Sequence, residues 1–114
     1  MNWKSIRLEL GCTSEFPAGS VSRAYLLRLP LDDHDRIDAD AFELNPRKAV
    51  VRRHWSTDPD ERGHVARNGA DWVLRCNGKD RTLRVESRCM RLGEKVQLVD
   101  AEGDALPLRI ASIR

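Results

Sequence analysis

Two Asn-Gly dipeptides, Asn68-Gly69 and Asn77-Gly78, separate three short runs of mixed polar and apolar residues. Asn-Gly supplies the positive φ angles that a tight two-residue hairpin turn requires, so each dipeptide predicts a chain reversal. The stretch from Gly63 to Glu86 is therefore expected to form a three-stranded antiparallel meander.

The two turns also predict a register for this meander. Pairing Arg67 with Ala70 in the first hairpin, and Cys76 with Arg81 in the second, gathers the apolar side chains on one face. The buried face then holds Val65, Trp72, Leu74, Leu83 and Val85. The outward face holds His64, Asp71, Val73, Arg75, Thr82, Arg84 and Glu86.

The rest of the chain continues the same pattern of short strands. Further strands are predicted near residues 6–10, 25–31, 49–55, 95–100 and 106–113. One short helix is expected near residues 39–45, because Asp38 can cap its start and Pro46 limits its length. We therefore expect a single all-β, mainly antiparallel domain over residues 1–114, a small barrel or two-layer sandwich of about eight strands.

Length and composition are those of an ordinary globular protein. At 114 residues, with 40% hydrophobic and 33% charged residues, the chain is large enough to bury a core without covalent or metal cross-links. No apolar run approaches the roughly 18 residues of a membrane span, and the amino-terminal segment lacks the apolar stretch of a signal peptide. These features predict a cytoplasmic protein that does not associate with membranes.

Neither the cysteines nor the histidines follow a metal-binding pattern. The three cysteines are an odd number without a Cys-x-x-Cys spacing, which predicts free thiols. His54 and His64 lie on different expected strands, and the sequence offers no third residue beside them at a spacing typical of metal ligands. The acidic segment 32–40 does not fit the calcium-loop template. The sequence therefore predicts no metal, no cofactor and no catalytic residue.

Like charges crowd one part of the outward face of the meander. The candidate anion-binding patch consists of Arg62, His64, Arg75 and Arg84. In the expected register Arg62 faces Arg75, and such crowding costs energy unless a negative charge answers it. We expect Asp71, Glu86 or the acidic segment 32–40 to neutralise the patch from within the chain. Binding of an external anion or a nucleic acid is the alternative.

Several segments resemble a set of short, uncharacterised bacterial proteins. They are Glu15 to Ser20, Tyr25 with Leu29 to Asp32, Val51 to Trp55, Gly63-His64 and Pro107 to Arg114. The resemblance covers nearly the whole chain and implies a compact, stand-alone bacterial protein. It transfers no activity, cofactor or functional residue.

Three classes of function remain open from the sequence. The favoured hypothesis is a non-enzymatic cytoplasmic β module that binds a protein partner, or a second copy of itself, through a sheet edge or a barrel face. The first alternative is a basic barrel that binds nucleic acid or another anion. The second is a small enzyme or ligand carrier whose site is assembled from distant residues, with Glu15, His54 and His64 as candidates. A pocket lined by polar groups would favour the ligand carrier.

Overall fold

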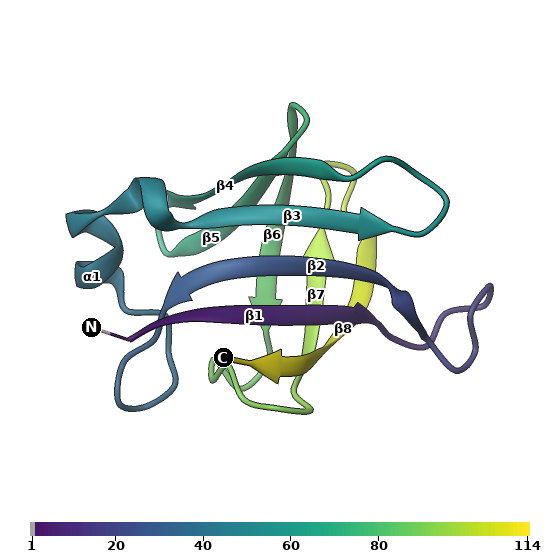
Figure 1. Cartoon of the computed structure of the whole chain (residues 1–114), viewed down its shortest axis with the longest axis horizontal. Helices are drawn as coiled ribbons and strands as arrows, with labels where there is room; N and C mark the ends of the chain where they lie inside the picture. Colours follow the sequence, from purple (N-terminus) through teal and green to yellow (C-terminus); the bar gives the residue numbers. More distant parts are fainter. Residues whose placement is uncertain (1) are drawn as a thin grey trace.

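The computed structural model describes residues 2–114 and shows an antiparallel barrel closed by eight strands in chain order (Figure 1). The strands are β1 (Trp3–Leu10), β2 (Ser20–Pro30), β3 (Val50–Trp55), β4 (Glu61–Asn68), β5 (Asp71–Cys76), β6 (Lys79–Val85), β7 (Lys95–Val99) and β8 (Ala105–Ile113). A short helix, α1 (Ala39–Leu44), and a 3₁₀ turn, η1 (Pro46–Lys48), lie between β2 and β3. The prediction of an all-β fold is confirmed, and a barrel is the form that it takes.

Pairing between the first and last strands closes the barrel. Ile6 of β1 lies opposite Ile113 of β8, and Leu10 lies opposite Leu108 at the other end of the same ladder. A register shift between Arg7 and Leu8 bends this ladder. Each of the eight strands therefore has a neighbour on both sides, which removes the unpaired edges of an open sheet.

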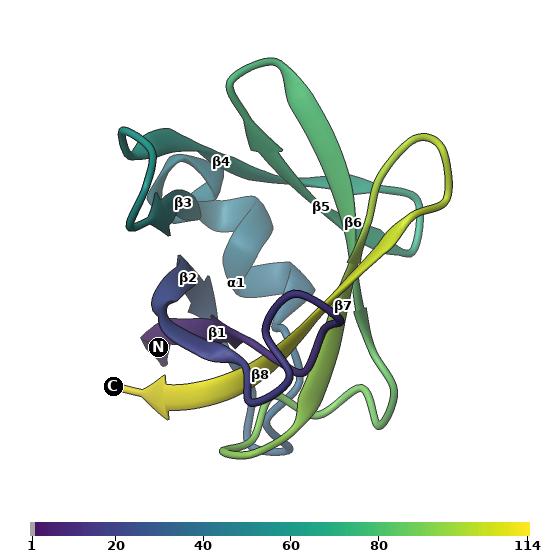
Figure 2. The ribbon, with the colours of Figure 1, turned by 90° about the vertical axis from the view of Figure 1, so that its right-hand side faces the viewer.

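Helix α1 lies across one end of the barrel (Figure 2). The Asp38 side chain caps it by accepting a hydrogen bond from the Ala41 backbone N–H, as the sequence predicts. The ring of Phe42 is buried and meets the ring of Trp72 edge-to-face, with 4.9 Å between the ring centroids. This contact fixes the helix to β5, and we call this end of the barrel the helix end. The opposite end, where β3 passes to β4 and β5 to β6, is called the open end.

The meander from Gly63 to Glu86 is present as β4, β5 and β6, but its predicted register is wrong in both hairpins. At the second turn Asn77 has φ 51° and Gly78 has φ 74°, so these two residues alone form the loop and Cys76 pairs with Lys79. Cys76 therefore does not pair with Arg81.

At the first turn Asn68 remains in the strand and pairs with Asp71. Gly69, with φ 62°, and Ala70 form the loop, so Arg67 pairs with Trp72 and not with Ala70. The error arises because an Asn-Gly dipeptide can supply both loop residues or only one of them.

The faces of the meander are nevertheless almost all as predicted, because each pairing is displaced by two residues and side chains alternate with period two. Val65, Leu74 and Leu83 are buried, while Trp72 and Val85 are half-buried against the same core. Val73 differs from the prediction of a solvated outward face, because it points outward but is only 6% exposed. It lies between Ala66 and Thr82 on the flanking strands.

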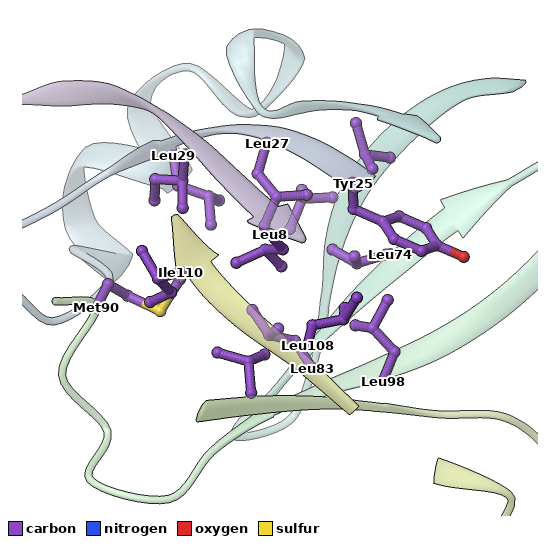
Figure 3. Packing of buried hydrophobic residues seen from close by; sticks show 14 of the residues in the cluster. Leu8, Tyr25, Leu27, Leu29, Leu74, Leu83, Met90, Leu98, Leu108 and Ile110 are labelled. Atoms are coloured by element: carbon purple, nitrogen blue, oxygen red, sulfur yellow. The ribbon is translucent and has the colours of Figure 1, made fainter. Parts of the chain in front are cut away.

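Inward side chains fill the interior of the barrel. Leucines from β1, β2, β5 and β8 meet in the centre, and Met90 closes the core from the loop between β6 and β7 (Figure 3). An eight-stranded barrel encloses a space that its own side chains can fill, so the interior here is a packed core.

Two further sequence predictions concern thiols and membranes. Cys12, Cys76 and Cys89 are all free, as their number and spacing predict. Within residues 2–114, no helix has the length and apolar composition needed to cross a bilayer.

Gly63 provides a test of the close approach between β4 and β5. A Cβ atom added there would overlap the carbonyl oxygen of Arg75, so Gly63→Ala must displace backbone. We expect a loss of about 3 kcal/mol or more in the free energy of unfolding, the upper range for overpacking. The matched variant Gly11→Ala places its Cβ in ordinary contact with Pro107 and should cost less than about 1 kcal/mol. Urea denaturation of both variants checks this, and equal losses would contradict it.

Candidate functional site

The structure separates the candidate anion-binding patch into two parts. Arg62 on β4 lies opposite Arg52 on β3, and not opposite Arg75 as expected. His64 is the residue that faces Arg75. Arg84 lies opposite Gln97 on β7, near the helix end of the barrel and away from the other three.

Arg75 is neutralised from within the chain, but by a residue that the sequence analysis did not name. Its guanidinium makes a two-point contact with the carboxylate of Asp80, its register partner on β6, at 2.8 and 3.1 Å. This contact lowers the pKa of Asp80 and raises that of Arg75. Neither Asp71, Glu86 nor the acidic segment 32–40 forms an ion pair with Arg75 among the described residues.

The candidate residues of the small-enzyme alternative do not meet in one site. The Nδ1 atom of His54 lies 2.9 Å from an Asp60 carboxylate oxygen, while His64 faces Arg75 one strand further on. Glu15 is exposed in the loop between β1 and β2. Across the described part of the chain, no three His, Cys, Asp or Glu side chains are grouped to hold a metal ion.

A cleft of about 930 Å³ opens at the helix end of the barrel, beside Trp72. Its walls come from the loop before α1, the turn between β4 and β5, the strands β5, β6 and β7, and the loop between β6 and β7. The lining residues are Arg36, Ile37, Ala70, Asp71, Trp72, Leu83, Arg84, Val85, Glu86, Arg88, Met90, Lys95 and Gln97. We refer to these residues together as the helix-end cleft.

The floor and the rim of the helix-end cleft differ in chemistry. The floor is apolar, because it consists of inward side chains at the ends of their strands and of flanking loops: Ile37, Trp72, Leu83, Val85 and Met90. The rim is charged and exposed, with four basic and two acidic side chains: Arg36, Arg84, Arg88, Lys95, Asp71 and Glu86. The cleft therefore offers an apolar surface bordered by an excess of positive charge.

Asp35 holds together the two loops that form one wall of the cleft. Its carbonyl oxygen accepts a hydrogen bond of 2.7 Å from the Met90 backbone N–H, and its carboxylate accepts one of 3.0 Å from Arg91. Asp35 has φ 60° and Arg88 has φ 62°, a left-handed conformation that residues other than glycine adopt rarely, although aspartate does so more often than arginine. Both residues lie in tight turns, in which the Asp35 N–H donates to the Asp32 carbonyl oxygen and the Arg88 N–H to the Val85 carbonyl oxygen.

The basic rim residues form no close ion pair with a carboxylate of the described chain. Within residues 2–114, Arg36, Arg84, Arg88 and Lys95 all lack a carboxylate within 4.0 Å. This separates them from Arg75 and Arg91, each of which has its own aspartate. Their donors therefore remain available to a ligand.

Sequence reasoning named only part of this cleft. Arg84, Asp71 and Glu86 were placed together on the outward face of the meander, and the structure places them around one opening. Arg36, Arg88 and Lys95 were missed because they lie in or next to loops that are far apart in the chain and meet through tertiary contacts, among them the hydrogen bonds of Asp35. The alternation of Arg84, Glu86 and Arg88 along the chain is the one local signal that continues into the second loop.

Comparison with family models, curated proteins and solved structures gives no match for this chain.

The Arg75–Asp80 pair predicts a change in titration. Replacing Arg75 with Gln removes the hydrogen bonds that favour the ionised carboxylate, so the pKa of Asp80 should rise toward the usual value for aspartate. Because the folded-state pKa is lowered, the pair stabilises the fold above the unfolded-state pKa, and this contribution is lost as pH falls through the folded-state pKa. NMR titration of side-chain carboxyl signals measures the shift, with Arg62→Gln as control. An unchanged Asp80 pKa in Arg75→Gln would show that the pair is not formed.

Proposed function

We propose that this protein is a non-enzymatic cytoplasmic module that binds a small amphipathic anion in the helix-end cleft. The observation that carries the proposal is the rim of four uncommitted basic side chains above an apolar floor. A carboxylate or phosphate ester with an aromatic or aliphatic body fits both parts. Three free cysteines support the cytoplasmic location, since reducing conditions keep thiols unpaired.

The size of the cleft supports a small-molecule ligand. Sites for such ligands usually occupy about 300 to 1,000 Å³ and combine apolar walls with a few polar groups, and the cleft at about 930 Å³ lies in this range. Trp72 supplies an aromatic surface that is half-buried and already positioned by Phe42. A ligand body placed against the half-buried Trp72 and Val85 would remove apolar surface from water.

The charges of the rim support an anionic group on that ligand. Arginine binds carboxylate and phosphate through two parallel hydrogen bonds, and three of the four basic rim residues are arginines. Four basic side chains against two acidic ones leave the rim with an excess of positive charge. The basic side chains therefore repel one another until an anion is bound. A ligand anion near Arg84 and Arg88 would relieve this repulsion.

The two other classes of function have less support. A protein partner or second copy that pairs with a sheet edge needs an unpaired strand, and the eight described strands are all paired on both sides. Exposed large hydrophobic residues come from four separate segments: Val21, Leu44, Val50 and Leu92. A nucleic acid would need unpaired basic side chains on the outer face of β3, β4 and β5. On that face Arg75 is paired with Asp80, and Arg52 lies 3.7 Å from Asp60.

The test uses two fluorescent probes that differ in charge. 1-Anilinonaphthalene-8-sulfonate is an amphipathic anion, and N-phenyl-1-naphthylamine is its neutral counterpart. We expect saturable binding of the anionic probe, weakened about tenfold by the double variant Arg84→Gln, Arg88→Gln, which corresponds to about 1.4 kcal/mol of binding free energy. Binding of the neutral probe should hardly change in this variant.

The matched control is the double variant Arg47→Gln, Arg114→Gln, which removes the same charge from two exposed arginines outside the cleft. It should bind the anionic probe as the wild type does. Circular dichroism melts of all three proteins ensure that the probe reports on folded protein. Equal weakening in both double variants, or none in either, would refute the proposed site.

A further inference from the structure

The two Asn-Gly turns of the meander differ in the conformation and the contacts of their asparagine. Asn68 is the last residue of β4, whereas Asn77 lies in its loop with φ 51°. Within residues 2–114 the Asn68 side chain forms no hydrogen bond. The Nδ2 atom of Asn77 donates a hydrogen bond of 3.1 Å to a Glu61 carboxylate oxygen. The Asn68 amide is therefore free to rotate over its own backbone, and the Asn77 amide is held.

The chain around Asn68 is also less firmly anchored to the core. Residues 67–71 are all exposed. Asn77, by contrast, directly follows Cys76, a core residue that is 3% exposed. Exposed strand ends open more readily than segments tied to the core, so Asn68 samples altered backbone geometries more often than Asn77 does.

An asparagine that precedes a glycine can lose its side-chain amide without an enzyme. The glycine backbone nitrogen gives up its proton to hydroxide and attacks the asparagine Cγ atom, so a C–N bond forms, the Cγ–Nδ2 bond breaks and Nδ2 leaves as ammonia. Water then opens the cyclic imide at one of its two carbonyl carbons, which leaves aspartate or isoaspartate. Glycine favours the attack because it has no Cβ atom to obstruct it. An added Cβ at Gly69 would meet nothing within 4 Å, so this turn is open to water.

A positive charge beside the first turn favours this reaction at Asn68. Negative charge develops on the attacking nitrogen and on the side-chain oxygen, so a nearby cation lowers the barrier. The Nε atom of Arg67 donates a hydrogen bond of 3.1 Å to the Gly69 carbonyl oxygen, which places a guanidinium at this turn. Glu43 lies 3.9 Å from Arg67, too far for a hydrogen bond, and its side chain is 61% exposed. The guanidinium therefore keeps most of its effect on the turn.

A negative charge at the second turn opposes the same reaction at Asn77. The Glu61 carboxylate is in hydrogen-bond contact with the amide that would have to react. It repels the negative charge that develops there and also holds the amide away from the Gly78 nitrogen. Lys79 follows this turn in the chain, but the carboxylate is the group that touches the amide.

We propose that Asn68 is a site of spontaneous deamidation, which adds a carboxylate beside the helix-end cleft. Asn68 is the register partner of Asp71, and Asp71 lines the cleft. A carboxylate at position 68 places like charges opposite each other and reduces the positive excess of the rim. The deamidation does not depend on the function proposed for the cleft, whereas its effect on ligand binding rests on that function.

Peptide mapping by mass spectrometry measures the reaction while the full chain is incubated in mildly alkaline buffer at physiological temperature. We expect Asn68 to be converted about fivefold faster than Asn77, which corresponds to about 1 kcal/mol of activation free energy. In denaturant the contacts of both turns are lost, and the two asparagines should react at similar rates. Equal rates in the folded protein, or faster reaction at Asn77, would overturn the proposal.

Variants test the electrostatic cause. Arg67→Gln should slow the conversion of Asn68 about threefold, in the range expected for an exposed charge pair. Glu61→Gln should speed the conversion of Asn77 by a similar factor. Arg47→Gln, an exposed arginine outside both turns, should change neither rate. An unchanged rate at Asn68 in Arg67→Gln would show that the guanidinium does not promote the reaction.

The variant Asn68→Asp reproduces the added charge for the binding assay. It should weaken binding of the anionic probe about threefold, the effect of one exposed charge. The matched variant Asn77→Asp adds the same charge at the open end and should bind as the wild type does. Wild-type affinity in Asn68→Asp would refute the effect on the cleft. Failure of the wild type to bind the probe would instead refute the function proposed for the cleft, while the mass spectra alone decide whether Asn68 deamidates.

Discussion

Closure of the sheet between β1 and β8 determines where this protein can bind anything. An eight-stranded barrel encloses a space that its own inward side chains fill, and here leucines, isoleucines and valines occupy it. Closure also leaves the described strands without a free edge for another strand. Binding sites are therefore restricted to the outer face and to the two ends, where the alternating inward positions run out.

The last inward positions of the strands are occupied differently at the two ends of the barrel. At the helix end, α1 covers part of the opening, and Phe42 packs on Trp72. The remaining apolar side chains form a floor beneath a charged rim. At the open end no helix intervenes, and the inward positions of β3 and β6 are occupied by Arg53 and Arg81.

The fold could be predicted from local signals because they agree with one another. Asn77-Gly78 and Asn68-Gly69 place the reversals, Asp38 places the helix, and alternation places the faces. The register could not be fixed in the same way, because Asn77 adopts a positive φ while Asn68 keeps an extended one in the strand. The predicted faces of the meander are nevertheless correct, because displacing the register by two residues returns each side chain to the same side of the sheet.

The candidate sites depend on information that the sequence pattern did not contain. Asp80 was not recognised as the partner of Arg75, since only the correct register makes them neighbours. The helix-end cleft needs two loops far apart in the chain, and Asp35 joins them through its carbonyl oxygen and its carboxylate. The inward arginines did leave a signal: Arg53 alternates with Val51 and Trp55. A charged side chain in the apolar phase of a strand indicates the end of a core, and in a closed barrel such an end is where a binding site can form.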